Sequence, residues 1–288
     1  MSAVPAAVPH QNELDALYAR LDPPTDQPVD LTGEFDKEFL AARYIWKKGS
    51  YRCGITAYII FFLMSPGFVQ RAAVSKPARF GQLISFAKSF DFTDVFIKQV
   101  TASGRGGTYG RGLPDEKIRK LLRAIQKAHD VLDIPHIEMV HFGYRLMQQL
   151  ENDIGDLPDA VKQYHLQYMS RVYRTMGIPF SSNRQLLENL CGVIEEQFTR
   201  FTPIAGQYGK RLLFLGLTVG VSCDKSNLSE LLPPTIKPVF ELHYQDFQPS
   251  FALRILGRIL NIVVYPRRRF RNPQPNREEI AFVASAGG

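Results

Sequence analysis

The stretch VHFGYRLMQQLENDIGDLPDAVKQYHLQYMSRVYRTMGIPF, residues 140–180, decides the fold. Two runs with apolar residues at the three-four spacing of a helix flank a short polar segment that ends at Leu157-Pro158. One helix is expected from about residue 135 to 151. A second helix should begin after the proline and stop at Gly177-Ile178-Pro179. A helical hairpin therefore stands in the middle of the chain.

Helical spacing recurs almost everywhere between residues 36 and 264, without strand-like alternation or a βαβ rhythm. This predicts an all-α class: a single globular bundle of roughly nine to twelve helices with irregular termini. DEKIRKLLRAIQKAHDVL (115–132) is one such helix, with its start at Pro114-Asp115, and Ser181 or Ser182 should cap another that runs to about Phe198. Further helices are expected at 207–220, 229–247 and 250–264.

Composition divides the 288 residues into three parts. The first 33 are rich in proline and predict an N-terminal arm, residues 34–265 form the helical domain, and residues 266–288 form a basic C-terminal tail. The formal net charge of +7 comes partly from arginines clustered in this tail. Such a cluster is typical of a solvated terminus, able to touch an anionic membrane, and it does not predict specific binding to nucleic acid.

Cysteine usage and apolar runs indicate the compartment. The three cysteines are far apart and form no CxxC pair, which suits a reducing environment. No secretory signal opens the sequence, and the apolar runs at 55–69 and 212–223 fall short of the roughly 20 residues that cross a bilayer. We expect a cytoplasmic protein with, at most, peripheral membrane contact.

Three local motifs resemble known metal-binding or phosphate-binding motifs, but each lacks a required feature. HIEMVH (136–141) is not a zinc-protease box, because its histidines are five residues apart and point in different directions on a helix. SGRGGTYGRG (103–112) lacks the lysine and the preceding strand of a phosphate-binding loop. Glu138 and His141 form one E-x-x-H unit, whereas a di-iron centre needs two.

Three histidines remain, each on the apolar stripe of a separate consecutive helix: His129, His141 and His165. In one interpretation each is a core residue with a hydrogen-bond partner. In the other, one of them binds haem, since a single neutral imidazole on an apolar face can supply the proximal iron ligand.

A resemblance bears on this choice. The stretch 140–180 resembles the central segment of the MpaB and rubber-oxygenase (latex-clearing protein) family, which typically reads W-V-H, a helix, a short loop, then Y-x-x-E-M-x-R-V-x-x-x-L-G-V-P. IRKLLRAIQKAHDVL is similar to the family's arginine-rich helix ending in a histidine. FFLMSPGFVQRAAVSKPARFGQLISFAKSFDFTDVFIKQVT (61–101) and LSELLPPTIKPVFELH (228–243) are similar to flanking regions. The similarity covers about residues 40–260.

The resemblance implies an all-α fold around haem b, with His129 as the ligand of the iron. Because the loop between His129 and His141 is shorter than usual in the family, His141 is the second choice and His165 the third. Together with Tyr144, the histidines that do not bind iron would shape the haem pocket.

The family's R-x-x-x-T element is only partly present. Its threonine matches Thr101, but Ile97 replaces its arginine and Lys98 is the nearest cation. The resemblance implies that Thr101 and Lys98 line the distal or propionate side as catalytic residues. Lysine offers only a point charge where arginine would bind in a bidentate way.

The expected function is therefore that of a haem-dependent oxygenase, or an oxygenase-like protein, that uses dioxygen on a hydrophobic, unsaturated terpenoid-type substrate. The alternative is a non-catalytic helical binding module that docks to an anionic membrane or partner through its basic tail. The sequence leaves the substrate, the reductant and the oligomeric state open.

Overall fold

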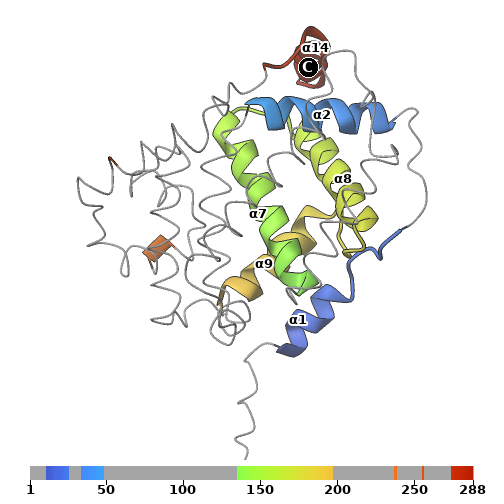
Figure 1. Cartoon of the computed structure of the whole chain (residues 1–288), viewed down its shortest axis with the longest axis vertical. Helices are drawn as coiled ribbons and strands as arrows, with labels where there is room; N and C mark the ends of the chain where they lie inside the picture. The colour runs from blue at the N-terminus through green and yellow to red at the C-terminus, as the bar shows by residue number, and fades with distance from the viewer. Residues whose placement is uncertain are drawn as a thin grey trace, which may run out of the picture.

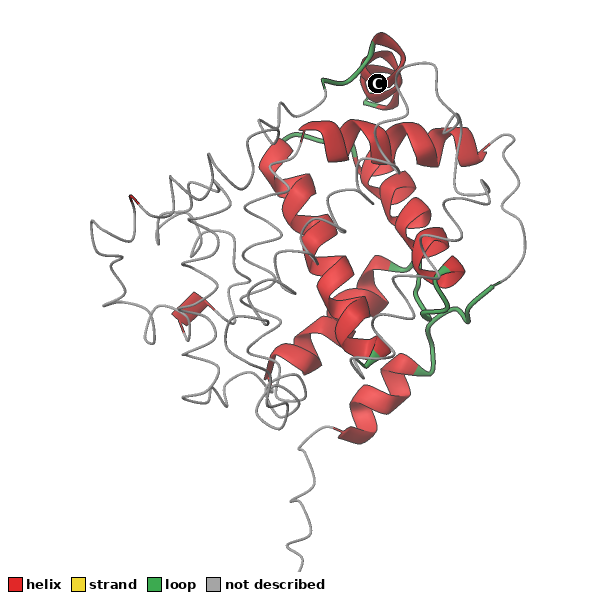
Figure 2. Cartoon of the chain, in the orientation of Figure 1, coloured by secondary structure: helices red, strands yellow, loops and turns green. Residues whose placement is uncertain are grey.

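The computed structural model describes residues 11–25, 34–48, 135–196, 237–238, 255 and 274–287. Within these ranges the regular structure is helical, and the only strand-like pairing is one antiparallel bridge between Asp22 and Phe180 (Figure 2). The helices are α1 (Gln11–Tyr18), α2 (Glu34–Lys48), α7 (His136–Ile154), α8 (Asp159–Thr175), α9 (Arg184–Glu196) and α14 (Arg277–Ala286) (Figure 1). The described part of the chain confirms the all-α class.

The predicted hairpin is formed by α7 and α8. Pro135 and Pro158 precede the two helices with φ of −61° and −56°, and proline suits a helix start because the first N–H groups have no partner within the helix. Gly155 and Gly177 follow the helices with φ of 84° and 85°, a conformation that strains residues with a Cβ atom. Both helices lie close to their predicted limits.

α2 packs across α8, and α14 lies against the outer side of α2 (Figure 1). The ring of Phe39 in α2 is 6.1 Å from that of Tyr168 in α8. Further along α2, the ring of Trp46 stands perpendicular to that of His165 with 6.3 Å between centroids. Aromatic contacts of this geometry fix how the two helices cross.

The start of α9 corrects one prediction. Asn183 caps the helix, because its Oδ1 accepts a hydrogen bond from the N–H of Leu186 at 3.1 Å. Ser181 and Ser182, expected in this role, do not fill it; Ser181 Oγ accepts from the N–H of Asn183 at 3.1 Å instead. All three residue types are good caps, so composition alone could not choose among them.

The N-terminal region is not an irregular arm throughout. Leu14 and Leu17 of α1 are buried, and the helix packs on α9. The segment after α1 joins the turn that follows α8, where Asp22 and Phe180 exchange backbone hydrogen bonds of 2.9 and 3.1 Å. The expectation of irregular structure is therefore wrong for residues 11–18.

The C-terminal region also contains a helix, α14, where an irregular basic tail was expected. Asn276 Oδ1 accepts from the N–H of Glu279, and Glu279 Oε2 accepts from the N–H of Asn276, both at 2.9 Å. This reciprocal capping box starts the helix. The asparagine and glutamate are three residues apart in the sequence, which is the spacing of a capping box.

None of the helices in the described ranges is long and apolar enough to cross a membrane. The helices expected at 115–132 and 207–220 lie outside these ranges. Those expected at 229–247 and 250–264 do so too, apart from residues 237, 238 and 255.

Candidate functional site

Three helices meet at the buried carboxylate of Glu151, near the end of α7. Nδ1 of His165 in α8 donates to its Oε1 at 2.9 Å, and Arg184 of α9 binds both oxygens at 3.1 and 3.4 Å. Burial alone would raise the pKa of Glu151, but the bonds with His165 and Arg184 outweigh it and hold the pKa below its usual range. Because an ionised carboxylate only accepts hydrogen bonds, a neutral His165 ring carries its proton on Nδ1 and its lone pair on Nε2.

Nε2 of His165 is buried in the core. It has no hydrogen-bond partner among the residues that the structure describes, and the same holds there for the buried indole N–H of Trp46. The two rings meet edge to face. A buried polar atom without a partner costs roughly 1–3 kcal/mol. An additional polar or metal-containing group at this point would therefore be stabilising, and an available lone pair on Nε2 is what a metal ion requires.

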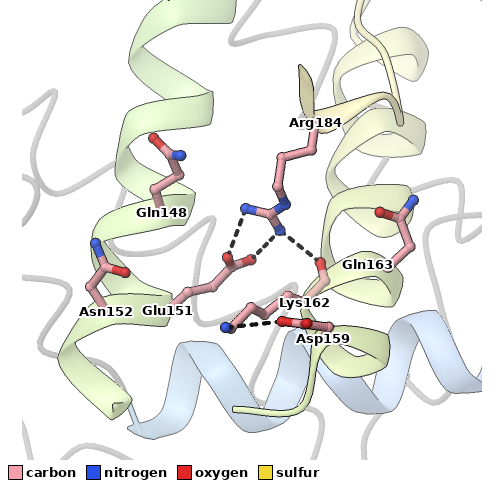
Figure 3. A pocket seen from close by; sticks show the side chains of 7 residues that line it. All are labelled: Gln148, Glu151, Asn152, Asp159, Lys162, Gln163 and Arg184. Atoms are coloured by element: carbon pink, nitrogen blue, oxygen red, sulfur yellow. Dashed lines mark hydrogen bonds and ion pairs between the residues drawn. The ribbon is translucent and has the colours of Figure 1, made fainter. Parts of the chain in front are cut away.

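Glu151 also lines a polar pocket of about 440 Å³ between α7, α8 and the first residue of α9 (Figure 3). Arg184 reaches across the pocket and donates to the backbone oxygen of Lys162 at 3.2 Å. The Lys162 ammonium pairs with Asp159 at 3.3 Å. Each acidic group of the lining is thus matched by a cation, which leaves the pocket polar without a strong net charge.

A second histidine is held in a similar way between α7 and α9. Nε2 of His141 donates to Oε1 of Glu195 at 3.1 Å, and Nε of Arg145, one turn further along α7, donates to the same oxygen at 2.6 Å. All three side chains are buried. In contrast to His165, the Nε2 atom of His141 is already engaged by a protein side chain.

Further hydrogen bonds link the pair of His141 and Glu195 to the pair of His165 and Glu151. Nη1 of Arg145 donates to Gln148 at 2.6 Å and to Glu188 at 2.8 Å, and Nε2 of Gln148 donates to Glu188 at 2.9 Å and to the Tyr144 hydroxyl at 3.1 Å. The Tyr144 hydroxyl in turn donates to the backbone oxygen of Arg184 at 3.4 Å. One network of buried and half-buried polar groups therefore connects both histidines.

Charge and burial set the ionisation of the pair formed by His141 and Glu195. Burial acts to raise the pKa of Glu195, but hydrogen bonds from His141 and Arg145 outweigh it and bring the pKa to about 2. For His141 burial is the largest influence and lowers the pKa in spite of the neighbouring carboxylate. At neutral pH the pair is a neutral imidazole beside an ionised glutamate.

The structure describes three of the predicted site residues, and it brings all three into this network: His141, His165 and Tyr144. Both histidines are buried, as their place on apolar stripes predicted. The other predicted site residues lie outside the described ranges: Lys98, Thr101 and His129.

The sequence did not reveal the partners of the histidines. These are Glu151, Glu195, Arg145, Arg184 and Trp46. Arg145 follows His141 by four residues, and this spacing could have placed both on one helical face. The other partners come from different helices, and their meeting depends on how those helices cross.

Comparison with protein-family models, with curated proteins and with solved structures gives no match for the chain.

Proposed function

We propose that this protein binds haem b and is an oxygenase, or an oxygenase-like protein, acting with dioxygen on a hydrophobic, unsaturated terpenoid-type substrate. The proposal includes a cytoplasmic location and a single bundle of nine to twelve helices. One observation carries it: the Nε2 atom of His165 is buried and lacks a partner in the described structure, while Nδ1 is held by Glu151. The family resemblance supports the same cofactor.

The environment of His165 suits an iron ligand. A carboxylate on the far nitrogen fixes the tautomer, orients the ring and makes the ligating nitrogen more basic, as for most metal-binding histidines. Among the described residues no group of three or more histidine, cysteine, aspartate or glutamate side chains could hold a metal ion. Haem needs fewer protein ligands than a bare metal ion, because the porphyrin supplies four ligands and one imidazole completes the attachment.

When bound, the haem would supply the chemistry of dioxygen activation. The side chains of the protein would bind the haem and shield it from water. His165 would ligate the iron, Glu151 would keep the imidazole oriented, and Arg184 would keep Glu151 ionised. Trp46 would pack at the edge of the ligand ring and exclude water.

Among the described histidines we propose His165 as the ligand, because Nε2 of His141 is occupied by Glu195. The family resemblance implies His129 as the first choice of ligand, with Thr101 and Lys98 on the distal or propionate side. These assignments are part of the proposal, and the choice between His165 and His129 is tested by single variants of the two histidines.

Absorption and fluorescence spectra test the function. Protein from haem-replete cells should show a Soret band, and haem at His165 should quench the emission of Trp46, the single tryptophan of the chain. His165→Ala should lose the band, whereas the control His136→Ala, at the half-buried start of α7, should retain it. Loss of the band in His129→Ala alone would move the ligand to His129. Protein that is colourless and does not take up added hemin would contradict the proposal and favour the helical binding module with its basic tail.

A further inference from the structure

α14 is attached to the protein through a charged group. Glu279 is the one residue among those described in α14 that is buried, and its exposed fraction is 0%. Nζ of Lys47 in α2 donates to both of its oxygens, at 2.7 and 2.9 Å. Nε of Arg43 lies 2.7 Å from Oε1 as an ion-pair contact, without the alignment of a hydrogen bond. Two nearly buried cations thus enclose one carboxylate.

The described part of α14 buries no continuous apolar stripe. A helix that docks by hydrophobic packing buries a continuous apolar stripe, but Ile280 in α14 is 51% exposed. Phe282 is half-buried and its ring lies 6.0 Å from that of Tyr164 in α8. The one described side chain that α14 buries fully is therefore a charged one.

The cations that hold α14 belong to the turn of α2 that reaches the candidate site. Trp46 immediately precedes Lys47, and its ring stands edge-on to His165. A helix fixed to Arg43 and Lys47 consequently restrains the turn that packs Trp46 on the histidine. Figure 1 shows α14 on the outer side of α2, and α14 also contacts α8 through Phe282 and Tyr164.

We propose that Arg43 and Lys47 form a carboxylate-binding site on α2, and that α14 is a displaceable strap that fills this site with Glu279 and secures the Trp46 turn. This inference does not depend on haem binding. In this proposal α14 controls how firmly the α2 turn that carries Trp46 is held against the candidate site.

Hydrogen exchange in the full chain tests the strap. Glu279→Gln removes the charge but keeps an N3 side chain that can complete the capping box, so it separates docking from helix capping. We expect amides 277–286 to exchange at least about tenfold faster, because two buried cations lose their counter-charge. Trp46 emission should shift to longer wavelength as its turn loosens. The matched control is Glu278→Gln, which changes the exposed neighbouring carboxylate and should alter neither readout.

A second variant approaches the contact from α2. Lys47→Met should accelerate the same amides, and combining it with Glu279→Gln should add less than the two single effects together, because both remove one interaction. Acetate should return the emission of Glu279→Ala toward that of the unmodified protein by refilling the site.

Three results would overturn the proposal. One is exchange at 277–286 that Glu279→Gln leaves unchanged. Another is an equal acceleration in Glu278→Gln. The third is an equal acceleration of the α7 amides, since this would make Glu279 part of the global core.

Discussion

Gly143 of α7 lies directly against the hydroxyl group of Tyr173 in α8. A Cβ atom at position 143 would overlap that hydroxyl and the adjoining ring carbon. The two helices of the hairpin thus make a close contact where α7 has no side chain, and only glycine permits it. This contact fixes the register that brings Glu151 of α7 to His165 of α8.

Gly143→Ala should destabilise the protein by about 1–3 kcal/mol, because overpacking forces Tyr173 or the helices to move. Urea unfolding measures the change. Gly192→Ala in α9 is the control: a Cβ there meets no atom within 4 Å, so the variant should be neutral or more stable by up to about 1 kcal/mol through helix propensity. Equal stability of the two variants would contradict the close contact.

Glu195→Gln should cost about 3 kcal/mol of unfolding free energy, since the buried guanidinium of Arg145 loses the closer of its two ionised partners, at 2.6 Å, and keeps only the half-buried Glu188. Thermal and urea unfolding give the value. Glu196→Gln alters the exposed neighbour and should change stability by less than about 0.5 kcal/mol. A Glu195 variant as stable as this control would show that the pair between α7 and α9 contributes nothing.

Stability should fall in acid because of the same residue. The pKa of Glu195 is about 2 in the folded protein and about 4.3 when unfolded. The unfolded state therefore binds more protons as the pH falls from about 5 to about 2, and about 3 kcal/mol of stability is lost. The lowered pKa of His141 acts in the same direction from about pH 6.5 downward. Urea midpoints across this range should drop more steeply for the unmodified chain than for Glu195→Gln, and parallel curves would refute the assignment.

Asn183→Ala should destabilise the protein by about 1 kcal/mol, the usual cost of an N-cap. Ser182→Ala should change stability by less than about 0.5 kcal/mol, because Asn183 caps the helix. The melting temperatures of the two variants show whether Asn183 or Ser182 caps the helix. A larger effect at Ser182 would restore the cap suggested by the sequence.

Local signals predicted the hairpin well, and they failed at the termini. Pro158 and Gly177 act on the backbone at their own positions, so the limits of α8 could be read from the sequence. The prolines and arginines near the ends suggested irregular arms, because composition averages over short helices. The capping pair Asn276 and Glu279 is a local signal that marks the start of α14 within this basic region.

The candidate site was predictable only in part. The apolar stripes placed His141 and His165 inside the protein, and both are buried. The identity of their carboxylate partners was not accessible, because it depends on helix crossings that no residue spacing encodes. Glu151 is 14 residues before His165, and only the turn at Gly155 brings them together.

The pairing of Asp22 with Phe180 has a consequence during synthesis of the chain. The segment after α1 also receives a hydrogen bond from Arg174 to the carbonyl of Pro23, across 151 residues. At typical rates of translation, on the order of ten seconds or more pass between the synthesis of α1 and that of α9, on which α1 packs. Until then Leu14 and Leu17 stay exposed to other nascent chains and to chaperones.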